Sequence, residues 1–211
     1  MQEEIIKALN TRYATKVFDS SKKISEENIH TILESARLSP SSMGLEMWKF
    51  IVINNTEIRA KLREAGYGQT KITDASHLVL ISYRTDIIEN ISKERLERTA
   101  KIQNKNISDL EGLKKMIDGS IEQKNKDGSL ESWVKMQSYI PLGIMIETAS
   151  LLGVDNCPME GFSLDKVDEI LELKNKNLKS ATMLALGYRG EDPESKRTKV
   201  RRDFNDVVEF I

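Results

Sequence analysis

The sequence contains few of the residues on which many active sites depend. Its 211 residues include one cysteine and two histidines. A single cysteine cannot form a disulfide within the chain, and two histidines provide little material for a metal site or a Ser-His-Asp triad. A chain with so little cysteine suits a reducing compartment, so we expect a cytoplasmic protein.

Charge and hydrophobicity exclude further classes. The 32 basic and 33 acidic residues give a net charge of −1, whereas nucleic-acid-binding domains usually carry a clear basic excess. The longest apolar stretches fall far below the roughly 18 residues of a membrane span, and the start, Met1–Glu4, lacks the pattern of a signal peptide. We therefore expect no nucleic-acid or membrane partner.

Glycine-rich phosphate motifs are also missing. The sequence contains neither Gly-x-Gly-x-x-Gly nor a Walker loop, the two short motifs that place backbone amides around a nucleotide phosphate. A nicotinamide nucleotide would therefore not be held as it is in a Rossmann domain.

The pattern of apolar residues predicts one α+β domain over residues 1–211. Residues 49–54, 77–83 and 181–188 have the composition of strands. Amphipathic helical segments lie between them, one of them with Ser25 as its expected N-cap. Interleaved helices and strands predict a small, mostly antiparallel sheet surrounded by helices.

Three other segments are less regular. Residues 133–152 predict one long apolar helix, kinked where Pro141 removes a backbone donor. Residues 155–162 contain proline and glycine and predict a turn-rich link. Residues 86–130 are charged and helical in pattern, and their apolar content is too low for a core of their own. We expect this block to be a helical excursion from the main core.

Basic residues near both ends of the chain form the first candidate site. Arg12 and Lys16 flank a polar turn, and Lys199 and Arg201 lie in the basic run 196–202. If the two ends meet, their cations would form a pocket suited to a phosphate dianion. Taken alone, the basic run fits a solvated tail or a weak nucleic-acid contact better than a phosphate site.

Two segments of small residues are further candidates. Ser39–Gly44 follows a predicted helix, and Cys157–Phe162 follows the long apolar segment. Such residues let backbone amides approach a polar ligand, although each segment also fits a plain connection. Cys157 has no histidine near it in the sequence, so we expect a small buried residue rather than a nucleophile.

Taken together, these segments resemble the nitroreductase and flavin reductase family. No single segment is specific, but they occur in register along nearly the whole chain. The segments that carry the resemblance are Arg12–Asp19, Leu38–Phe50, Thr73–His77, Pro158–Phe162, Leu186–Arg189 and Lys199–Arg201.

The resemblance implies an intertwined homodimer with flavin mononucleotide (FMN) bound at the subunit interface. Arg12, Lys199 and Arg201 would bind the FMN phosphate, and Lys16 would lie near the pyrimidine edge of the flavin. The residues that the resemblance assigns to FMN are Arg12, Tyr13, Ala14, Lys16, Pro40, Ser41, Ser42, Gln69, Lys71, Pro158, Met159, Glu160, Gly161, Lys199 and Arg201.

Other assigned residues would face the reacting part of the flavin. Pro40, Ser41 and Ser42 would come from the partner subunit. Lys71 would lie near the flavin and the nicotinamide, and the Glu160–Gly161 turn would direct a backbone N–H to flavin N5.

The chain departs from the usual family pattern in two places. Gly44–Met47 stands where many members have Asn and Gln-Pro before the tryptophan, and in this it resembles a subgroup of Gram-positive bacterial NAD(P)H nitroreductases that carry Ser-Ser-x-Gly-Leu-Glu. The usual asparagine that contacts the flavin pyrimidine falls at Gly68 or Gln69. The resemblance also implies that residues 86–130, where it is weakest, would cover the active site.

The implied activity is the reduction of nitroaromatics, quinones or flavins by NAD(P)H. The order would be ping-pong, and no catalytic side chain is required because flavin N5 carries the hydride. Two alternatives remain. One is a flavin carrier or redox sensor without turnover; the other is a nucleic-acid or partner-binding module that uses residues 196–202.

Overall fold

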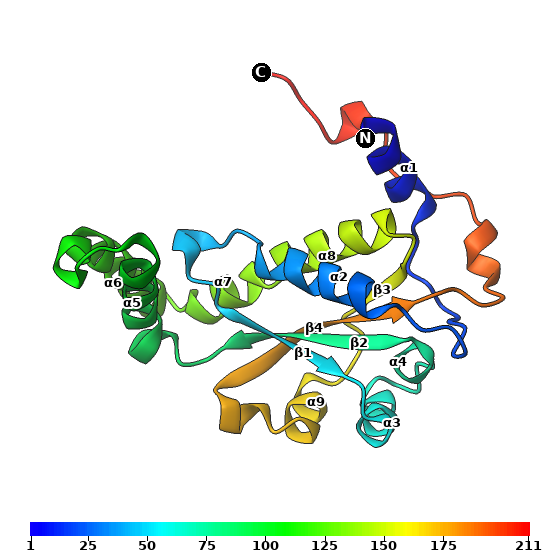
Figure 1. The fold of residues 1–211 in the computed structure, drawn as a ribbon, viewed down its shortest axis with the longest axis horizontal. Coiled ribbons are helices and arrows are strands. Elements are labelled where there is room, and N and C mark those ends of the chain that lie inside the picture. The colour runs from blue at the N-terminus through cyan, green and yellow to red at the C-terminus, as the bar shows by residue number, and fades with distance from the viewer.

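A four-stranded antiparallel sheet with the strand order β1-β2-β4-β3 forms the centre of the computed structural model, which describes all 211 residues (Figure 1). The strands are β1 (Trp48–Ile53), β2 (His77–Arg84), β3 (Asp155–Met159) and β4 (Leu178–Gly187). Every neighbouring pair is antiparallel. The predicted small antiparallel sheet is therefore confirmed.

Helices cover both faces of this sheet. α2 and α8 lie on one face, and α3 and α9 lie on the other (Figure 1). The helices are α1 (Gln2–Thr11), α2 (Glu26–Arg37), α3 (Thr56–Ala65), α4 (Lys71–Asp74), α5 (Ser92–Gln103), α6 (Glu111–Lys126), α7 (Leu130–Gln137), α8 (Tyr139–Leu151) and α9 (Leu164–Ile170). None of them combines the length and the apolar character needed to traverse a lipid bilayer.

The two covered faces explain why the central strands are apolar at almost every position. In β2, Leu78 and Leu80 pack in the core on the α3–α9 side, whereas Val79 and Ile81 pack in the core on the α2–α8 side. Side chains alternate between the faces of a strand, so a strand buried on both sides reads as a continuous apolar run. The sequence pattern of β2 and β4 follows from this burial.

Residues 86–130 form α5, α6 and short helical turns beyond one end of the sheet (Figure 1). Their buried side chains, such as Ile91 and Ile117, pack in one cluster with Leu45, Met47 and Tyr83. The block thus completes its packing with side chains from β2 and from the loop before β1.

Two predicted segments differ in the structure. Residues 155–159, expected to be part of a turn-rich link, form strand β3. Pro158 is tolerated there because β3 is an edge strand of the sheet and has only one neighbouring strand, β4. The predicted long helix over residues 133–152 is also wrong, because the chain breaks at Ser138 into α7 and α8. Pro141 lies in the first turn of α8, where a missing N–H leaves little unsatisfied.

The two ends of the chain lie beside each other (Figure 1). The ammonium group of Lys199 donates to the backbone carbonyls of Leu9 and Arg12, the latter at 2.5 Å. The C-terminal segment therefore packs along the end of α1, and this contact forms the cavity described next.

Candidate functional site

A cavity of about 610 Å³ lies between the end of α1, the turn that follows it and the C-terminal segment. Six basic side chains and a single carboxylate, Glu194, line it. The basic residues are Arg12, Lys16, Arg189, Arg197, Lys199 and Arg201. The phosphate pocket predicted from the sequence requires the two ends of the chain to meet, and in the structure they do.

Like charges crowd this cavity. The pKa of Lys199 is lowered by burial and by the nearby Arg12 and Arg201. Burial and Arg201 lower the pKa of Arg12 as well. The Nε of Arg12 is buried and has no hydrogen-bond partner. An anion would relieve both the repulsion and the unsatisfied donor, so the cavity has the properties of a phosphate site.

The turn after α1 is held against β3 and the C-terminal segment. Ala14 forms a parallel bridge with Asn156, and the N–H of Thr15 donates to the Asn156 carbonyl at 3.2 Å. The Oδ2 of Asp192 accepts from the hydroxyl of Tyr13 at 2.8 Å and from the N–H of Lys16 at 2.7 Å. Sequence reasoning missed Asp192, because its partners lie 179 and 176 positions away.

Arg189 supports the same turn from its other side. Its guanidinium lies 4.9 Å from the centre of the Tyr13 ring, within the range of a cation–π contact. Its Nε donates to Oδ1 of Asp155 at 2.8 Å. Because Asp155 begins β3, this pair ties Tyr13 to the edge strand of the sheet.

The Glu160–Gly161 turn leaves the end of β3 and is fixed from three directions. Tyr139 of α8 donates its hydroxyl hydrogen to the Glu160 carboxylate. Gln69 donates to the Gly161 carbonyl at 2.7 Å, and Thr182 donates to the Met159 carbonyl at 2.9 Å. Burial and then Glu160 raise the pKa of Tyr139 to about 12.

Gln69 and Gly68 occupy different positions relative to this turn. The side-chain amide of Gln69 donates to the carbonyls of Gly66 and Gly161, which leaves its own carbonyl oxygen without a donor from the protein. Gly68 has a φ of +77° and accepts at its backbone carbonyl from Arg63. Of these two residues, only Gln69 has a side chain, and that side chain reaches Gly161.

Lys71, Lys16 and Arg12 lie close enough to Cys157, the middle residue of β3, for their charges to act on its thiol. Burial raises the pKa of the Cys157 thiol, and the charges of Lys71, Lys16 and Arg12 oppose this rise. The thiol is 1% exposed, which fits the buried residue expected from the sequence. Another residue that sequence reasoning missed, Arg59, holds the α4 segment that carries Lys71.

Arg59 is 5% exposed and its guanidinium faces the end of α4. Its Nε donates to the Ile72 carbonyl at 2.7 Å, and its Nη2 donates to the Ala75 carbonyl at 2.6 Å. These are carbonyls that the end of a short helix leaves without partners. Arg59 therefore fixes the segment that presents Gln69 and Lys71.

Pro40, Ser41 and Ser42 do not line the cavity. They follow the C-terminal end of α2, and the N–H of Ser42 donates to Oε1 of Gln137 at 2.8 Å. The loop continues through Gly44, which has a φ of +64° and packs against the guanidinium of Arg95. Within one chain, this loop and the cationic cavity are separate.

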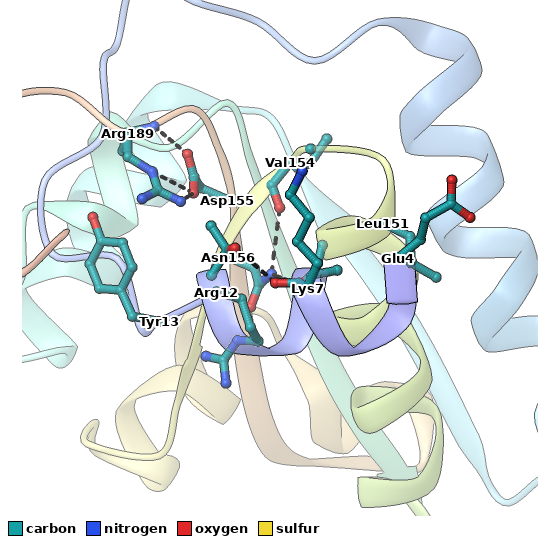
Figure 2. A pocket seen from close by; sticks show the side chains of 13 residues that line it. Glu4, Lys7, Arg12, Tyr13, Leu151, Val154, Asp155, Asn156 and Arg189 are labelled. Carbon is teal, nitrogen blue, oxygen red and sulfur yellow. Dashed lines mark hydrogen bonds and ion pairs between the residues drawn. The ribbon is translucent and has the colours of Figure 1, made fainter. Parts of the chain in front are cut away.

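A second cavity, of about 650 Å³, lies between α1 and the turn from α8 to β3 (Figure 2). Thr11, Arg12, Tyr13 and Arg189 line both cavities. In Figure 2 the side chain of Arg189 points toward Asp155, which begins β3. The two cavities are therefore neighbours that share these four lining residues.

Comparisons with known proteins all lead to one family. The model of the nitroreductase family matches residues 9–188. The chain is 40% identical to a Staphylococcus haemolyticus protein, provisionally named an NAD(P)H nitroreductase, over 100% of this chain and 99% of the relative.

Two solved structures share the fold. A Bacillus subtilis protein, titled as a nitroreductase, superposes with a TM-score of 0.86 at 21% identity and covers 100% of both chains. A protein from Exiguobacterium sibiricum, whose structure is titled as a nitroreductase in complex with FMN, has a TM-score of 0.77 at 21% identity. That match covers 99% of this chain and 96% of the other.

Proposed function

Because the chain belongs to the nitroreductase family, we propose that it is an FMN-dependent oxidoreductase that takes electrons from NADH or NADPH and reduces nitroaromatics, quinones or flavins. The observation that carries the proposal is the cationic cavity where the two chain ends meet. A relative at 40% identity carries the name NAD(P)H nitroreductase, and a structure of the same fold is titled as an FMN complex.

The cavity fits the phosphate of FMN. Arg12, Lys199 and Arg201 would bind this phosphate, which carries nearly two negative charges. The unpartnered Nε of Arg12 and the lowered pKa of Lys199 are both properties that a bound dianion would relieve. The volume of about 610 Å³ also lies within the usual range of a cofactor site.

The residues along β3 would hold the flavin ring. Tyr13, Ala14, Gln69, Pro158 and Met159 would line it. Lys16 would place positive charge near its pyrimidine edge and stabilise the negative charge of the reduced form. Lys71 would lie near the flavin and the nicotinamide.

The Glu160–Gly161 turn would direct a backbone N–H to flavin N5. Gln69 and Tyr139 keep that turn in place through their bonds to the Gly161 carbonyl and the Glu160 carboxylate. When bound, FMN supplies an N5 atom that accepts and then donates a hydride. The protein contributes position and electrostatics, and it needs no catalytic side chain.

We further propose that the protein acts as a homodimer, with Pro40, Ser41 and Ser42 reaching the partner's cavity. The separation of this loop from the cavity of its own chain supports the proposal. Large apolar side chains also stand exposed along the C-terminal segment, including Phe204 at 63% and Phe210 at 87%. Exposed apolar side chains gathered on one segment are typical of an interface.

Steady-state kinetics test the proposed function. The FMN-loaded protein is mixed with NADPH or NADH and with a quinone or a nitroaromatic, and nicotinamide oxidation is followed. We expect turnover with parallel double-reciprocal lines, because the nicotinamide product leaves before the acceptor enters. Tight FMN binding without nicotinamide oxidation would instead indicate a flavin carrier or redox sensor, and failure to bind FMN would contradict the proposal.

A further inference from the structure

Asp192 lies buried between the two walls of the cationic cavity. It is 4% exposed. Its Oδ2 accepts from the Tyr13 hydroxyl at 2.8 Å, from the Lys16 N–H at 2.7 Å and from the Val17 N–H at 3.2 Å. These three donors belong to the turn that follows α1, which forms the first wall.

The same carboxylate also organises the second wall. Its Oδ1 accepts from the Glu194 N–H at 3.0 Å, at the start of the short helical turn Pro193–Lys196. The backbone carbonyl of Asp192 accepts from the hydroxyl of Ser195 at 2.6 Å. The chain then continues through the cavity-lining residues 197–201. One side chain therefore joins two segments that are far apart in the sequence.

We propose that Asp192 is a positioning residue for the phosphate end of the cofactor: it fixes the two walls of the cavity so that the cations of both chain ends face one anion. The inference rests on the proposed function, in which Arg12, Lys199 and Arg201 bind the FMN phosphate. Asp192 itself does not face the cavity as a lining residue.

Its hydrogen bonds keep Asp192 ionised. Burial raises the pKa of this carboxyl, but its hydrogen bonds from the Lys16 N–H, the Tyr13 hydroxyl and the N–H groups of Glu194 and Val17 together lower it by more, so the net shift is downward. A carboxylate that accepts several N–H donors favours its charged form. The group is therefore a fixed negative charge beneath a cluster of positive ones.

Because Asp192 is charged, the direction in which Asp192→Asn changes FMN affinity tests whether the residue acts through its charge or through its position. A negative charge close to the phosphate repels it, so an effect of charge alone predicts that Asp192→Asn strengthens FMN binding. An effect of position predicts the opposite. The amide of asparagine presents N–H groups to backbone donors, and the two walls would separate.

The experiment compares the dissociation constants of FMN and riboflavin, measured by quenching of flavin fluorescence. Riboflavin lacks the phosphate and reports on the ring site alone. For Asp192→Asn we expect FMN to bind at least about tenfold more weakly, the loss from one charge-assisted hydrogen bond. Riboflavin should change by less than about threefold, because the affinity for the ring is unaffected.

A matched control separates position from general loss of stability. Asp168 accepts from the N–H of Ser180 at 2.9 Å, away from the cavity. Asp168→Asn should leave the ratio of FMN affinity to riboflavin affinity unchanged. If Asp192→Asn does not fold, Tyr13→Phe removes a single bond to the same carboxylate. Tyr13→Phe should also lower the ratio of FMN affinity to riboflavin affinity, but by a smaller factor than Asp192→Asn.

Each outcome has a distinct meaning. Equal weakening of both flavins, unchanged binding or tighter FMN binding in Asp192→Asn would overturn the positioning role. A wild-type protein that binds FMN no better than riboflavin would instead contradict the proposed function, since its cavity would not recognise a phosphate.

Discussion

The buried guanidinium of Arg59 provides a measurable test of how the segment carrying Gln69 and Lys71 is held. Arg59 has two short hydrogen bonds, to the carbonyls of Ile72 and Ala75, and a longer one of 3.4 Å to the carbonyl of Ser76. No carboxylate forms an ion pair with it; burial lowers its pKa, and the charge of Asp74 opposes this to a smaller extent. Its contribution to stability therefore comes mainly from these carbonyls.

The substitution Arg59→Met keeps much of the apolar stem and removes every donor. Hydrogen bonds from charged donors contribute about 1.5–3 kcal/mol each, and two good ones are lost. Removing the guanidinium also removes its cost of burial, which offsets part of the loss. We expect the free energy of unfolding to fall by about 2–4 kcal/mol.

Urea denaturation measures this change. Arg59→Lys should lose less, because lysine keeps the charge but cannot match the planar fork of donors. The matched control is Arg63→Met, one turn along α3, whose Nε donates to the Gly68 carbonyl at 3.1 Å in a more exposed setting. A loss below about 1 kcal/mol for Arg59→Met, or equal losses at both positions, would refute the reasoning.

Three further substitutions or reactions test other parts of the structure. Arg201→Ala should weaken FMN binding about tenfold or more. The substitution should not lower the melting temperature of the FMN-free protein, because it removes the repulsion between Arg201 and Lys199; a lower melting temperature would contradict this expectation. Gly44→Ala should lower the melting temperature, because its Cβ would lie 2.8 Å from Nη2 of Arg95 at a φ of +64°, whereas Gly143→Ala in α8, with nothing within 4 Å, should not. Cys157 should resist a thiol reagent in the folded protein and react once in urea, because it is buried and burial raises its pKa; rapid labelling of the folded protein would show that β3 is open.

The fold could be predicted where burial leaves a local pattern. β2 and β4 are covered on both faces, so their apolar runs are visible in the sequence. The Ser25 cap is also local, since its hydroxyl accepts from the N–H of Asn28, three residues on. β3 was not predicted, because a segment with Pro158 has the composition of a turn. Its position at the edge of the sheet, which makes proline acceptable, is decided by the whole fold.

The candidate site, like the fold, contains residues that the sequence reveals and residues that it does not. The cations at both ends of the chain are visible in the sequence as charge clusters, and the resemblance assigns Arg12, Lys199 and Arg201 among them to the FMN phosphate. The residues that hold the segments of the site in place also act through bonds to backbone groups: Asp192 fixes the turn after α1, and Arg59 fixes the segment that carries Lys71. Such bonds leave no spacing or composition signal, and those of Asp192 to the turn after α1 cross more than 170 positions.

The direct test of the central claim is the visible spectrum of the purified protein after incubation with FMN and removal of free flavin, recorded under argon before and after addition of NADPH or NADH. We expect a yellow protein whose flavin absorbance disappears when the nicotinamide is added. A colourless protein that retains no FMN would contradict the assignment of the cationic cavity. A yellow protein that either nicotinamide leaves unchanged would contradict the proposed electron donor.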